Sequence, residues 1–243
     1  MTYCVGLKLN RGLVFMSDTR TNAGVDNFST TRKMFSWEVP GDRLITIMTA
    51  GNLATTQALI SLLEERSKTV RERDPSILKA PTMFQVARLV GATLREIIAE
   101  SKPAGSNSDS PFRASLIVGG QIKGSNPTLF LVYPEGNFIE ATSDAPWFQI
   151  GEAKYGKPIL VRAFDPEMTF SEAAKLLLVS FDSTVKANLS VGLPFDLQTY
   201  RRDSFEVDRQ IRIAMDDPMY QSISTGWGDA LREAFNFLPS YEL

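Results

Sequence analysis

The second residue of the chain carries two groups that together could hydrolyse an amide bond. Thr2 stands directly behind the initiator methionine. Because a small side chain at this position permits removal of the methionine, we expect Thr2 to become the first residue of the mature chain. An α-amine titrates at about 7.7–8.0, so part of it is unprotonated near neutral pH. The amine is therefore a workable base for activating the hydroxyl of the same residue. Many unrelated proteins also begin Met-Thr, so Thr2 needs support from other residues.

The amino-acid counts exclude the usual partners of a hydrolytic nucleophile. The 243 residues contain no histidine and one cysteine, Cys4. The absence of histidine excludes Ser-His-Asp and Cys-His catalysis, imidazole metal ligands and histidine pH switching. A single thiolate disfavours zinc, and Cys4 is expected to be a buried thiol without an internal disulfide partner. The base must come from a carboxylate, a lysine or the α-amine, and this chemistry needs no cofactor.

Three charged residues follow the first two expected strands and could support the nucleophile. Asp18 and Arg20 come directly after the strand that pairs with the Thr2 strand, so both should lie near Thr2. An inward-pointing Lys33 beside Asp18 would form a charge pair that lowers the pKa of the hydroxyl. The simpler interpretation stays open: Asp18 and Arg20 form a charged turn, and Lys33 reaches solvent from a strand.

A glycine joins an expected strand to an expected helix in the segment Thr-Ala-Gly-Asn at 49–52. Gly51 would let a ligand approach the backbone closely. Its N–H group, near the positive end of a helix, could stabilise an oxyanion. A plain turn between a strand and a helix explains the same residues.

Apolar patterns predict the elements that would hold these residues. Residues 3–9 and 13–16 are expected to form a hairpin through the turn at 10–12. Apolar residues spaced by three and four predict helices over about 52–73 and 81–102, and a third from Thr169, where Glu172 completes the spacing of a capping box. Further strands are expected at 31–37, 43–49, 114–118, 129–133, 138–141, 195–200 and 206–213, with polar connections at 17–30 and 103–111.

The order of these elements favours an α+β fold. Two helices arrive together between β-rich blocks, which fits layered sheets flanked by helices better than a parallel βαβ sheet. No repeat or break in composition divides the chain, so residues 1–243 are expected to form a single domain.

Taken together, these features resemble the β-type proteasome subunits, which belong to the N-terminal-nucleophile hydrolases. The corresponding residues are Thr2, the Asp-Thr-Arg-Thr segment at 18–21, Lys33 and the Thr-Ala-Gly turn at 49–51. The bacterial Anbu (ancestral β-subunit) family is the most similar, through Met-Thr-Tyr-Cys-Val-Gly at the start and Asn-Leu-Ser-Val-Gly-Leu-Pro at 188–194. The segment Trp-Gly-Asp-Ala-Leu-Arg at 227–232 resembles that family as well.

The resemblance implies a four-layer αββα sandwich and a role for each matching residue. Thr2 is the nucleophile, and its amine takes part in proton transfer. Asp18 and Lys33 are the supporting charge pair, and the N–H of Gly51 is the oxyanion donor. Arg20 holds the Asp18 segment in place.

The second half of the chain departs from the proteasome pattern. The segment Ile-Gly-Glu-Ala-Lys at 150–154 has Glu152 where a serine is expected. Ser190 can occupy a second serine position, but Ala187 falls where an aspartate is expected. Because those groups organise the threonine amine in proteasomes, the substitutions bear directly on activity, and Ser190 is a supporting candidate only.

Two classes of function therefore compete. The first is a threonine-type endopeptidase, or an amidase acting on small substrates. The second is a weakly active or inactive assembly protein with the same fold. The resemblance implies self-assembly into a ring or an open helical array, a peptide or protein substrate, and an unfoldase partner as an open question.

Composition and charge also bear on the partners and the location of the protein. A net charge of −2 and the absence of clustered basic residues argue against nucleic-acid partners. No apolar run reaches the roughly 18–20 residues that cross a bilayer, and the first residues do not have the pattern of a secretory signal. The expected location is cytoplasmic.

Overall fold

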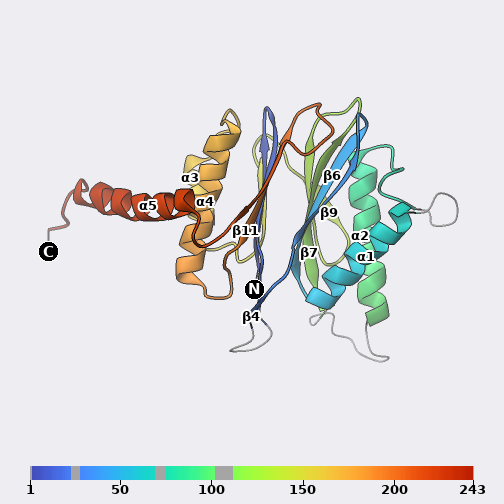
Figure 1. The fold of residues 1–243 in the computed structure, drawn as a ribbon, viewed down its shortest axis with the longest axis horizontal. Coiled ribbons are helices and arrows are strands. Elements are labelled where there is room, and N and C mark those ends of the chain that lie inside the picture. The colour runs from blue at the N-terminus through green and yellow to red at the C-terminus, as the bar shows by residue number, and fades with distance from the viewer. Residues whose placement is uncertain (1, 23–27, 69–74, 102–111, 243) are drawn as a thin grey trace.

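Two five-stranded antiparallel sheets form the centre of the molecule (Figure 1). The computed structural model describes residues 2–22, 28–68, 75–101 and 112–242. The first sheet has the strand order β10-β1-β2-β11-β12 and the second has the order β5-β6-β7-β8-β9. The first consists of β1 (Tyr3–Leu9), β2 (Gly12–Asp18), β10 (Trp147–Gly151), β11 (Phe195–Arg201) and β12 (Arg209–Ile213). The second consists of β5 (Met34–Val39), β6 (Arg43–Gly51), β7 (Ala114–Ile122), β8 (Thr128–Val132) and β9 (Phe138–Glu140).

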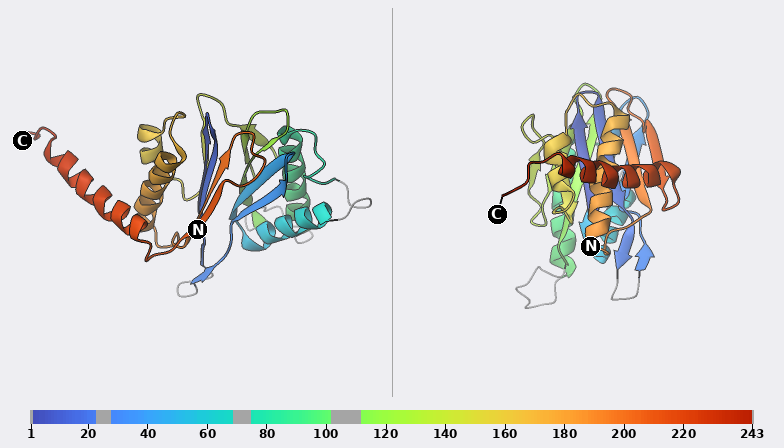
Figure 2. Two further views of the ribbon diagram at one scale, coloured as in Figure 1. Left: turned by 45° about the horizontal axis from the view of Figure 1, so that its top comes forward. Right: turned by 90° about the vertical axis from the view of Figure 1, so that its left-hand side faces the viewer.

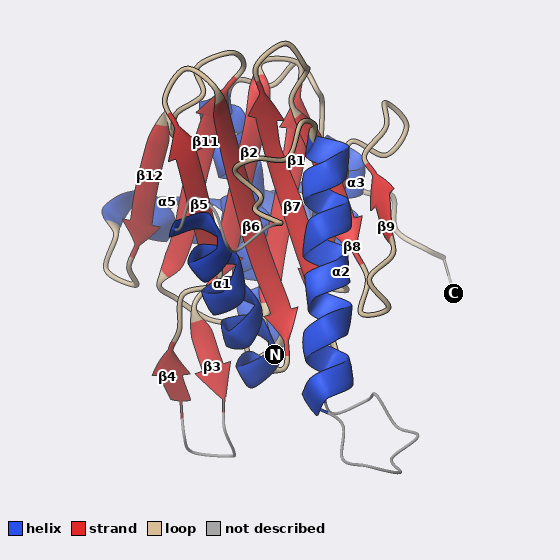
Figure 3. Ribbon diagram, turned by 90° about the vertical axis from the view of Figure 1, so that its right-hand side faces the viewer, coloured by secondary structure: helices blue, strands red, loops and turns tan. Residues whose placement is uncertain are grey.

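A pair of helices covers the outer face of each sheet (Figure 1, Figure 3). Helices α1 (Leu53–Lys68) and α2 (Met83–Ser101) pack on the second sheet, and α3 (Lys157–Ala163) and α4 (Phe170–Ala187) pack on the first. A third apolar cluster fills the space between the two sheets. The result is a four-layer αββα sandwich, so the expected α+β fold is confirmed.

Strand β1 packs against both neighbouring layers, because its side chains alternate between its two faces. Tyr3, Val5 and Leu7 point to the cluster beneath α3 and α4, whereas Cys4 points into the space between the sheets. Successive side chains of a strand face opposite sides. Thr2, one residue before Tyr3, therefore belongs on the same side as Cys4, which is the inner side of the sandwich.

Helices α2 and α4 follow their sequence patterns closely. In α2, Val86, Val90 and Leu94 are fully buried at a spacing of four residues, as expected for one apolar face. At the start of α4, the hydroxyl of Thr169 accepts the N–H of Glu172, and the carboxylate of Glu172 accepts the N–H of Thr169. The expected capping box is confirmed.

Several elements differ from the sequence expectation. The first long helix ends at Lys68, and residues 69–73 of the expected range lie outside the described residues, as does the whole connection at 103–111. The connection at 17–30 contains two short paired strands, β3 (Arg20–Asn22) and β4 (Phe28–Thr30). The patterns also did not predict β10, α3 or the last helix.

That last helix, α5 (Pro218–Asn236), leaves the sandwich instead of packing along it (Figure 2). Asp217 caps its start by accepting the N–H of Tyr220 at 2.8 Å, and Pro218 occupies the first helical position. Tyr220 is buried against the first sheet, whereas Leu231 and Phe235 are 49% and 74% exposed. Among the described residues, no helix is both long and apolar enough to span a lipid bilayer.

Candidate active site

A cavity of about 400 Å³ opens at the end of the sandwich where β1 begins. Its walls come from the start of β1, the end of β6, the start of α1, the end of β10 and the segment around β3. The residues that line it are Thr2, Thr21, Arg32, Lys33, Thr49, Ala50, Gly51, Leu53, Thr56 and Gly151. Three residues identified from the sequence, Thr2, Lys33 and Gly51, therefore meet in one cavity.

A larger hollow of about 620 Å³ lies beside α1 and α2. Arg66 and Glu96, which form part of its wall, pair with each other at 3.1 Å. None of the residues identified from the sequence lines it. The chemistry therefore points to the smaller cavity.

Thr2 is held at the edge of this cavity by the strand on its other side. Tyr3 pairs with Gly151 in the β1–β10 register, and the N–H of Glu152 donates to the carbonyl of Thr2 at 2.6 Å. Gly151 has φ of 83°, and a Cβ at this position would lie 1.9 Å from the Thr2 oxygen. Only glycine lets β10 pass this close to Thr2.

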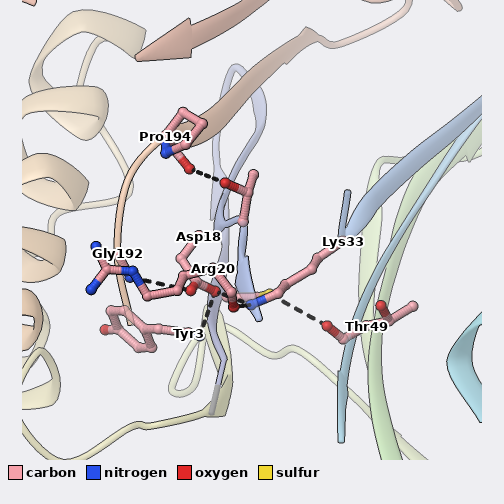
Figure 4. A network of polar contacts seen from close by, with 9 residues as sticks. Tyr3, Asp18, Arg20, Lys33, Thr49, Gly192 and Pro194 are labelled. Carbon is pink, nitrogen blue, oxygen red and sulfur yellow. Dashed lines mark hydrogen bonds and ion pairs between the residues drawn. The ribbon is translucent and has the colours of Figure 1, made fainter. Parts of the chain in front are cut away.

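The carboxylate of Asp18 accepts from three donors, which belong to Tyr3, Lys33 and Gly192 (Figure 4). Oδ1 accepts the Tyr3 N–H at 3.0 Å and lies 2.7 Å from the Lys33 ammonium. Oδ2 accepts the Gly192 N–H at 3.4 Å. The Lys33 ammonium also donates to the carbonyl of Arg20 at 2.6 Å. The ammonium group of Lys33 is therefore fixed, and it does not reach solvent.

Burial and pairing act on Asp18 in opposite directions. The Asp18 side chain is inaccessible to solvent, and this burial raises its pKa above the ordinary value. The Lys33 ammonium and the N–H groups of Tyr3 and Gly192 lower the pKa and offset part of that rise. Lys33 makes the largest of the contributions that lower the Asp18 pKa, so its loss would let burial raise that pKa further. The charge pair therefore depends on both residues.

Cys4 is the one thiol of the chain, and its surroundings keep it inert. Burial raises the pKa of the Cys4 thiol well above its ordinary value. The thiol lies 3.7 Å from the carbonyl oxygen of Thr49 and is inaccessible to solvent. Because the thiolate is the reactive form, a buried neutral thiol does not compete with Thr2. The expected buried thiol is confirmed.

Arg20 binds the segment that follows α4. Its guanidinium donates to the carbonyl of Leu189 at 2.8 Å. It also lies against Gly192, where a Cβ would come within 2.2 Å of the guanidinium carbon. Thr19, beside it, donates its hydroxyl proton to the carbonyl of Pro194 at 2.7 Å. These contacts fit the holding role expected for Arg20, because they fix the segment whose Gly192 N–H binds Asp18.

Gly51 directs its backbone N–H away from β7. The N–H groups of a strand in an antiparallel sheet alternate between its two neighbours. Asn52 donates to the Arg113 carbonyl on the β7 side at 2.9 Å, and Thr49 donates to the Lys33 carbonyl on the β5 side at 2.9 Å. Gly51, two residues after Thr49, therefore points its N–H past the start of β5 toward the cavity. Gly51 has φ of 120°, and a Cβ there would lie 2.4 Å from the Arg113 oxygen, so this position accepts only glycine.

Ser190 lies outside the group of described residues that line the cavity. Its N–H donates to the side-chain oxygen of Asn188 at 2.9 Å, and the amide nitrogen of Asn188 donates to the Glu152 carboxylate at 2.9 Å. The resemblance to proteasome subunits marked Glu152 as a departure and gave Asn188 no role. The one signal that the sequence offered for this contact was the acidic residue Glu152 directly after Gly151.

The comparisons with known proteins agree over the length of the chain. Residues 2–193 match the sequence model of the proteasome subunit family. The chain is similar to an Anbu mutant from Hyphomicrobium sp. strain MC1, with 49% identity, all of both chains covered and a TM-score of 0.93. It is similar to Anbu (ancestral beta-subunit) from Yersinia bercovieri, with 45% identity, 99% of this chain and 100% of that chain covered and a TM-score of 0.92.

A third similar structure is the helical assembly of the Anbu complex from Pseudomonas aeruginosa. The identity is 44%, the alignment covers 99% of this chain and 98% of that chain, and the TM-score is 0.91. No match is found among curated proteins.

Proposed function

This chain belongs to the Anbu family of proteasome-type proteins, and from that premise we propose that it is an amide hydrolase whose nucleophile is Thr2. The proposal requires that Met1, which lies outside the described residues, is removed in the mature protein. The substrate class that fits best is a peptide bond, because the cavity is open and has both polar and apolar walls.

One observation carries the proposal. Thr2 precedes β1, Lys33 precedes β5 and Gly51 ends β6, yet all three line the same cavity, while Lys33 is paired with Asp18 at 2.7 Å. A nucleophile, a fixed positive charge and an N–H donor within one cavity are the parts that acyl transfer needs. A structural explanation of the Asp18–Lys33 pair alone does not account for Gly51 and Thr2 lying beside it.

The proposed reaction has two steps. The Thr2 amine takes the hydroxyl proton as Oγ bonds to the carbonyl carbon of the substrate, and the Gly51 N–H stabilises the oxyanion. The C–N bond then breaks, and the leaving amine takes the proton from the Thr2 ammonium. Water attacks the acyl-enzyme and gives a proton to the same amine; the C–Oγ bond then breaks, Oγ takes that proton back from the ammonium, and the acid leaves. The Lys33 ammonium favours the deprotonated form of the nearby hydroxyl.

We also propose that the protein associates with further copies of itself. The similar protein from Pseudomonas aeruginosa is described as a helical assembly. In this chain, α5 and the residues that follow it carry large exposed apolar side chains: Met219, Leu231, Phe235, Phe237, Leu238 and Tyr241. Apolar side chains gathered on one projecting segment are typical of a contact surface, and a second copy of the chain is its expected occupant.

The test is turnover of peptide and small-amide libraries by protein whose first residue is Thr2. We expect the wild type to cleave at least one class of amide, and Thr2→Ala to lose at least about 1,000-fold in rate, as for removal of the nucleophile in serine proteases. Thr56→Ala is the matched control, because Thr56 lines the same cavity but gives its hydroxyl proton to the carbonyl of Leu53 at 3.0 Å. Assembly without turnover in the wild type would instead favour a non-catalytic assembly protein.

A further inference from the structure

We propose that Glu152, held by Asn188, is the positioning residue for the Thr2 amine. This inference rests on the proposed function only in assuming that Thr2 carries a free amine. The Glu152 carboxylate would accept a hydrogen bond from the amine and stabilise the ammonium that forms when the amine takes the hydroxyl proton. The chain would thus replace the serine and aspartate of the proteasome pattern with a glutamate and an asparagine.

The backbone places Glu152 opposite Thr2 at the end of the β1–β10 pair. Its N–H donates to the Thr2 carbonyl at 2.6 Å, so the two residues are direct cross-strand neighbours. Gly151, with φ of 83°, turns the chain out of the strand immediately before Glu152. As a result, the Glu152 side chain departs from the alternation of β10 and reaches the end of α4, where it meets Asn188 at 2.9 Å.

The segment from Asn188 to Gly192 connects the two carboxylates that flank the start of β1. At one end, the Asn188 amide donates to Glu152. At the other end, the Gly192 N–H donates to Asp18, which also accepts the N–H of Tyr3. The Thr2–Tyr3 backbone is hydrogen-bonded to both sides, to Glu152 through the Thr2 carbonyl and to Asp18 through the Tyr3 N–H. The two residues that carry these acidic groups therefore flank the start of β1, where the Thr2 nitrogen would begin the processed chain.

The two carboxylates differ in what neutralises them. Asp18 has the Lys33 ammonium at 2.7 Å. Glu152 is buried, with 8% of its surface exposed, and its side-chain partner is the neutral Asn188 amide. Within the described part of the chain, no lysine or arginine lies within ion-pair distance of Glu152. A buried carboxylate is costly without a cation, and the α-ammonium of Thr2 is the cation that the processed chain would bring to this position.

A carboxylate beside an amine favours the protonated form and raises the pKa of the amine. The charged groups that line the cavity with Thr2 are Lys33, from the segment before β5, and Arg32, which donates to the carbonyl of Met34 at 2.6 Å. Asp18 from β2, Arg20 from β3 and Glu152 from the turn after β10 are the charged groups of the neighbouring elements. Lys33 is engaged by Asp18, and Arg20 is engaged by the Leu189 carbonyl. Glu152 is therefore the group whose removal should change the titration of the amine most strongly without breaking the Asp18–Lys33 pair.

The experiment measures the titration of the Thr2 amine without any substrate. Full-length protein whose first residue is Thr2, exposed by cleavage of a fusion, is labelled with trace acetic anhydride from pH 5 to 10. Mass spectrometry of the N-terminal peptide then gives the pKa of the amine. Glu152→Gln keeps the shape of the side chain and can still accept the Asn188 hydrogen bond. Glu140→Gln is the matched control, because Glu140 is exposed on β9 and carries the same change.

We expect Glu152→Gln to lower the pKa of the amine by about one unit, a tenfold change in the protonation equilibrium, and Glu140→Gln to leave it in place. Asn188→Ala should lower it by a smaller amount, and Glu152→Asp should recover part of the wild-type value. Asn188→Ala serves as the deciding variant if Glu152→Gln does not fold. An amine pKa that is the same in the wild type and in the folded Glu152 or Asn188 variants would overturn the inference.

The test of Glu152 and the test of the proposed hydrolase can fail independently of each other. A shifted amine pKa in a protein that cleaves no amide would support the role of Glu152 and count against the hydrolase. Amide turnover with an amine pKa that does not respond to Glu152 would support the hydrolase and remove Glu152 from its mechanism.

Discussion

At the Thr2 end of the sandwich, charged and polar groups are buried and paired with one another, whereas α5 carries large apolar side chains into solvent. Lys33 and Asp18 have 6% and 0% of their side-chain surfaces exposed and lie 2.7 Å apart. Phe235, near the end of α5, is 74% exposed. Burial of charge and exposure of apolar surface both carry a free-energy cost in an isolated chain.

This contrast indicates where each region finds its partners. At the Thr2 end, the Asp18 carboxylate and the Lys33 ammonium find their partners within one chain, in β1, β3 and the segment after α4. Helix α5 contacts the sandwich through its first two turns, where Tyr220 and Ile223 join the apolar cluster beneath α4 and the Ser224 hydroxyl accepts from the Lys186 ammonium at 3.1 Å. Its later residues Leu231 and Phe235 are exposed. We therefore assign the chemistry to the single chain and the exposed surface of α5 to contacts between copies, and the following predictions test that division.

The largest expected effect on stability follows from breaking the buried charge pair. Lys33→Ala should lower the free energy of unfolding by about 3–5 kcal/mol, because it leaves Asp18 buried without its cation. Lys68→Ala is the control, since Lys68 and Glu64 are 75% and 45% exposed and 3.9 Å apart. That variant should cost at most about 0.5 kcal/mol. Urea unfolding measures both, and equal losses would contradict the division.

The stability that Lys33→Ala loses should also depend on pH. Burial raises the pKa of Asp18 in the folded state above its unfolded value, and Lys33 opposes that rise. Without Lys33, the folded protein holds the Asp18 proton to higher pH, so its stability is present below the unfolded pKa and falls as pH rises through the folded pKa. The deficit of Lys33→Ala should therefore be smaller at pH 5 than at pH 8.

The next effect concerns α5 and should change assembly without changing the fold. Leu231 and Phe235 lie four residues apart, on one face of the helix. The double variant Leu231→Ser, Phe235→Ser should weaken self-association by about 100-fold or more, if both side chains are buried between copies. Unfolding of the sandwich should change little, because both are exposed in the single chain. Light scattering measures the mass, with Glu233→Gln as control. An unchanged mass would remove α5 from the contact.

A smaller effect should appear at alkaline pH, through the strand that carries the nucleophile. Burial raises the pKa of the Tyr3 phenol to about 12. Its hydroxyl lies 2.8 Å from the Ser180 hydroxyl and accepts a hydrogen bond from Gln149. Because the folded pKa is raised above the unfolded value of about 10, this stability is present below pH 10 and lost as pH rises toward 12.

The matched variant for Tyr3 is Tyr3→Phe, which cannot ionise. We expect the stability of the wild type relative to Tyr3→Phe to fall by roughly 2 kcal/mol between pH 10 and 12. Urea unfolding at a series of pH values measures the difference. Parallel curves for the two proteins over this range would show that Tyr3 is not held as a neutral, buried phenol.

The smallest effect belongs to the capping box of α4, which lies outside both regions. The N–H and hydroxyl of Thr169 lower the pKa of the fully exposed Glu172 carboxyl. Its contribution is present above the ordinary carboxyl pKa and lost as pH falls through the lowered value. Glu172→Gln should therefore reduce the melting temperature slightly at pH 7 and not at pH 2.5. Thermal unfolding at the two pH values is the check, and an equal reduction at both would contradict the charge dependence.

The sequence allowed much of the Thr2 end to be predicted, because its parts follow local rules. A hairpin with a short turn brings residues 3–9 and 12–18 together, so Asp18 had to lie near the start of β1. Lys33 and Gly51 each stand at a strand end, and the resemblance supplied their relation to Thr2. The layered fold followed from two consecutive helices between β-rich blocks.

The contact between Glu152 and Asn188 could not be predicted in the same way. It joins the end of β10 to the end of α4, residues 36 apart in sequence, and the short patterns of β10 gave no signal by themselves. Helix α5 was missed for another reason: Gly226 and Gly228 weaken its intrinsic propensity, and most of its side chains do not face this chain's own core. Apolar side chains that the single chain does not bury give no pattern that identifies them as part of its core.

The sharpest test of Thr2 as the nucleophile is intact-mass and peptide mass spectrometry of the protein from its native source after treatment with a peptide epoxyketone. This reagent forms its ring adduct only with a hydroxyl and a free amine on the same N-terminal residue. We expect a chain that begins at Thr2 and carries one adduct on Thr2, and no adduct after Lys33→Ala. A chain that retains Met1, or a processed chain without an adduct on Thr2, would show that Thr2 is not the nucleophile.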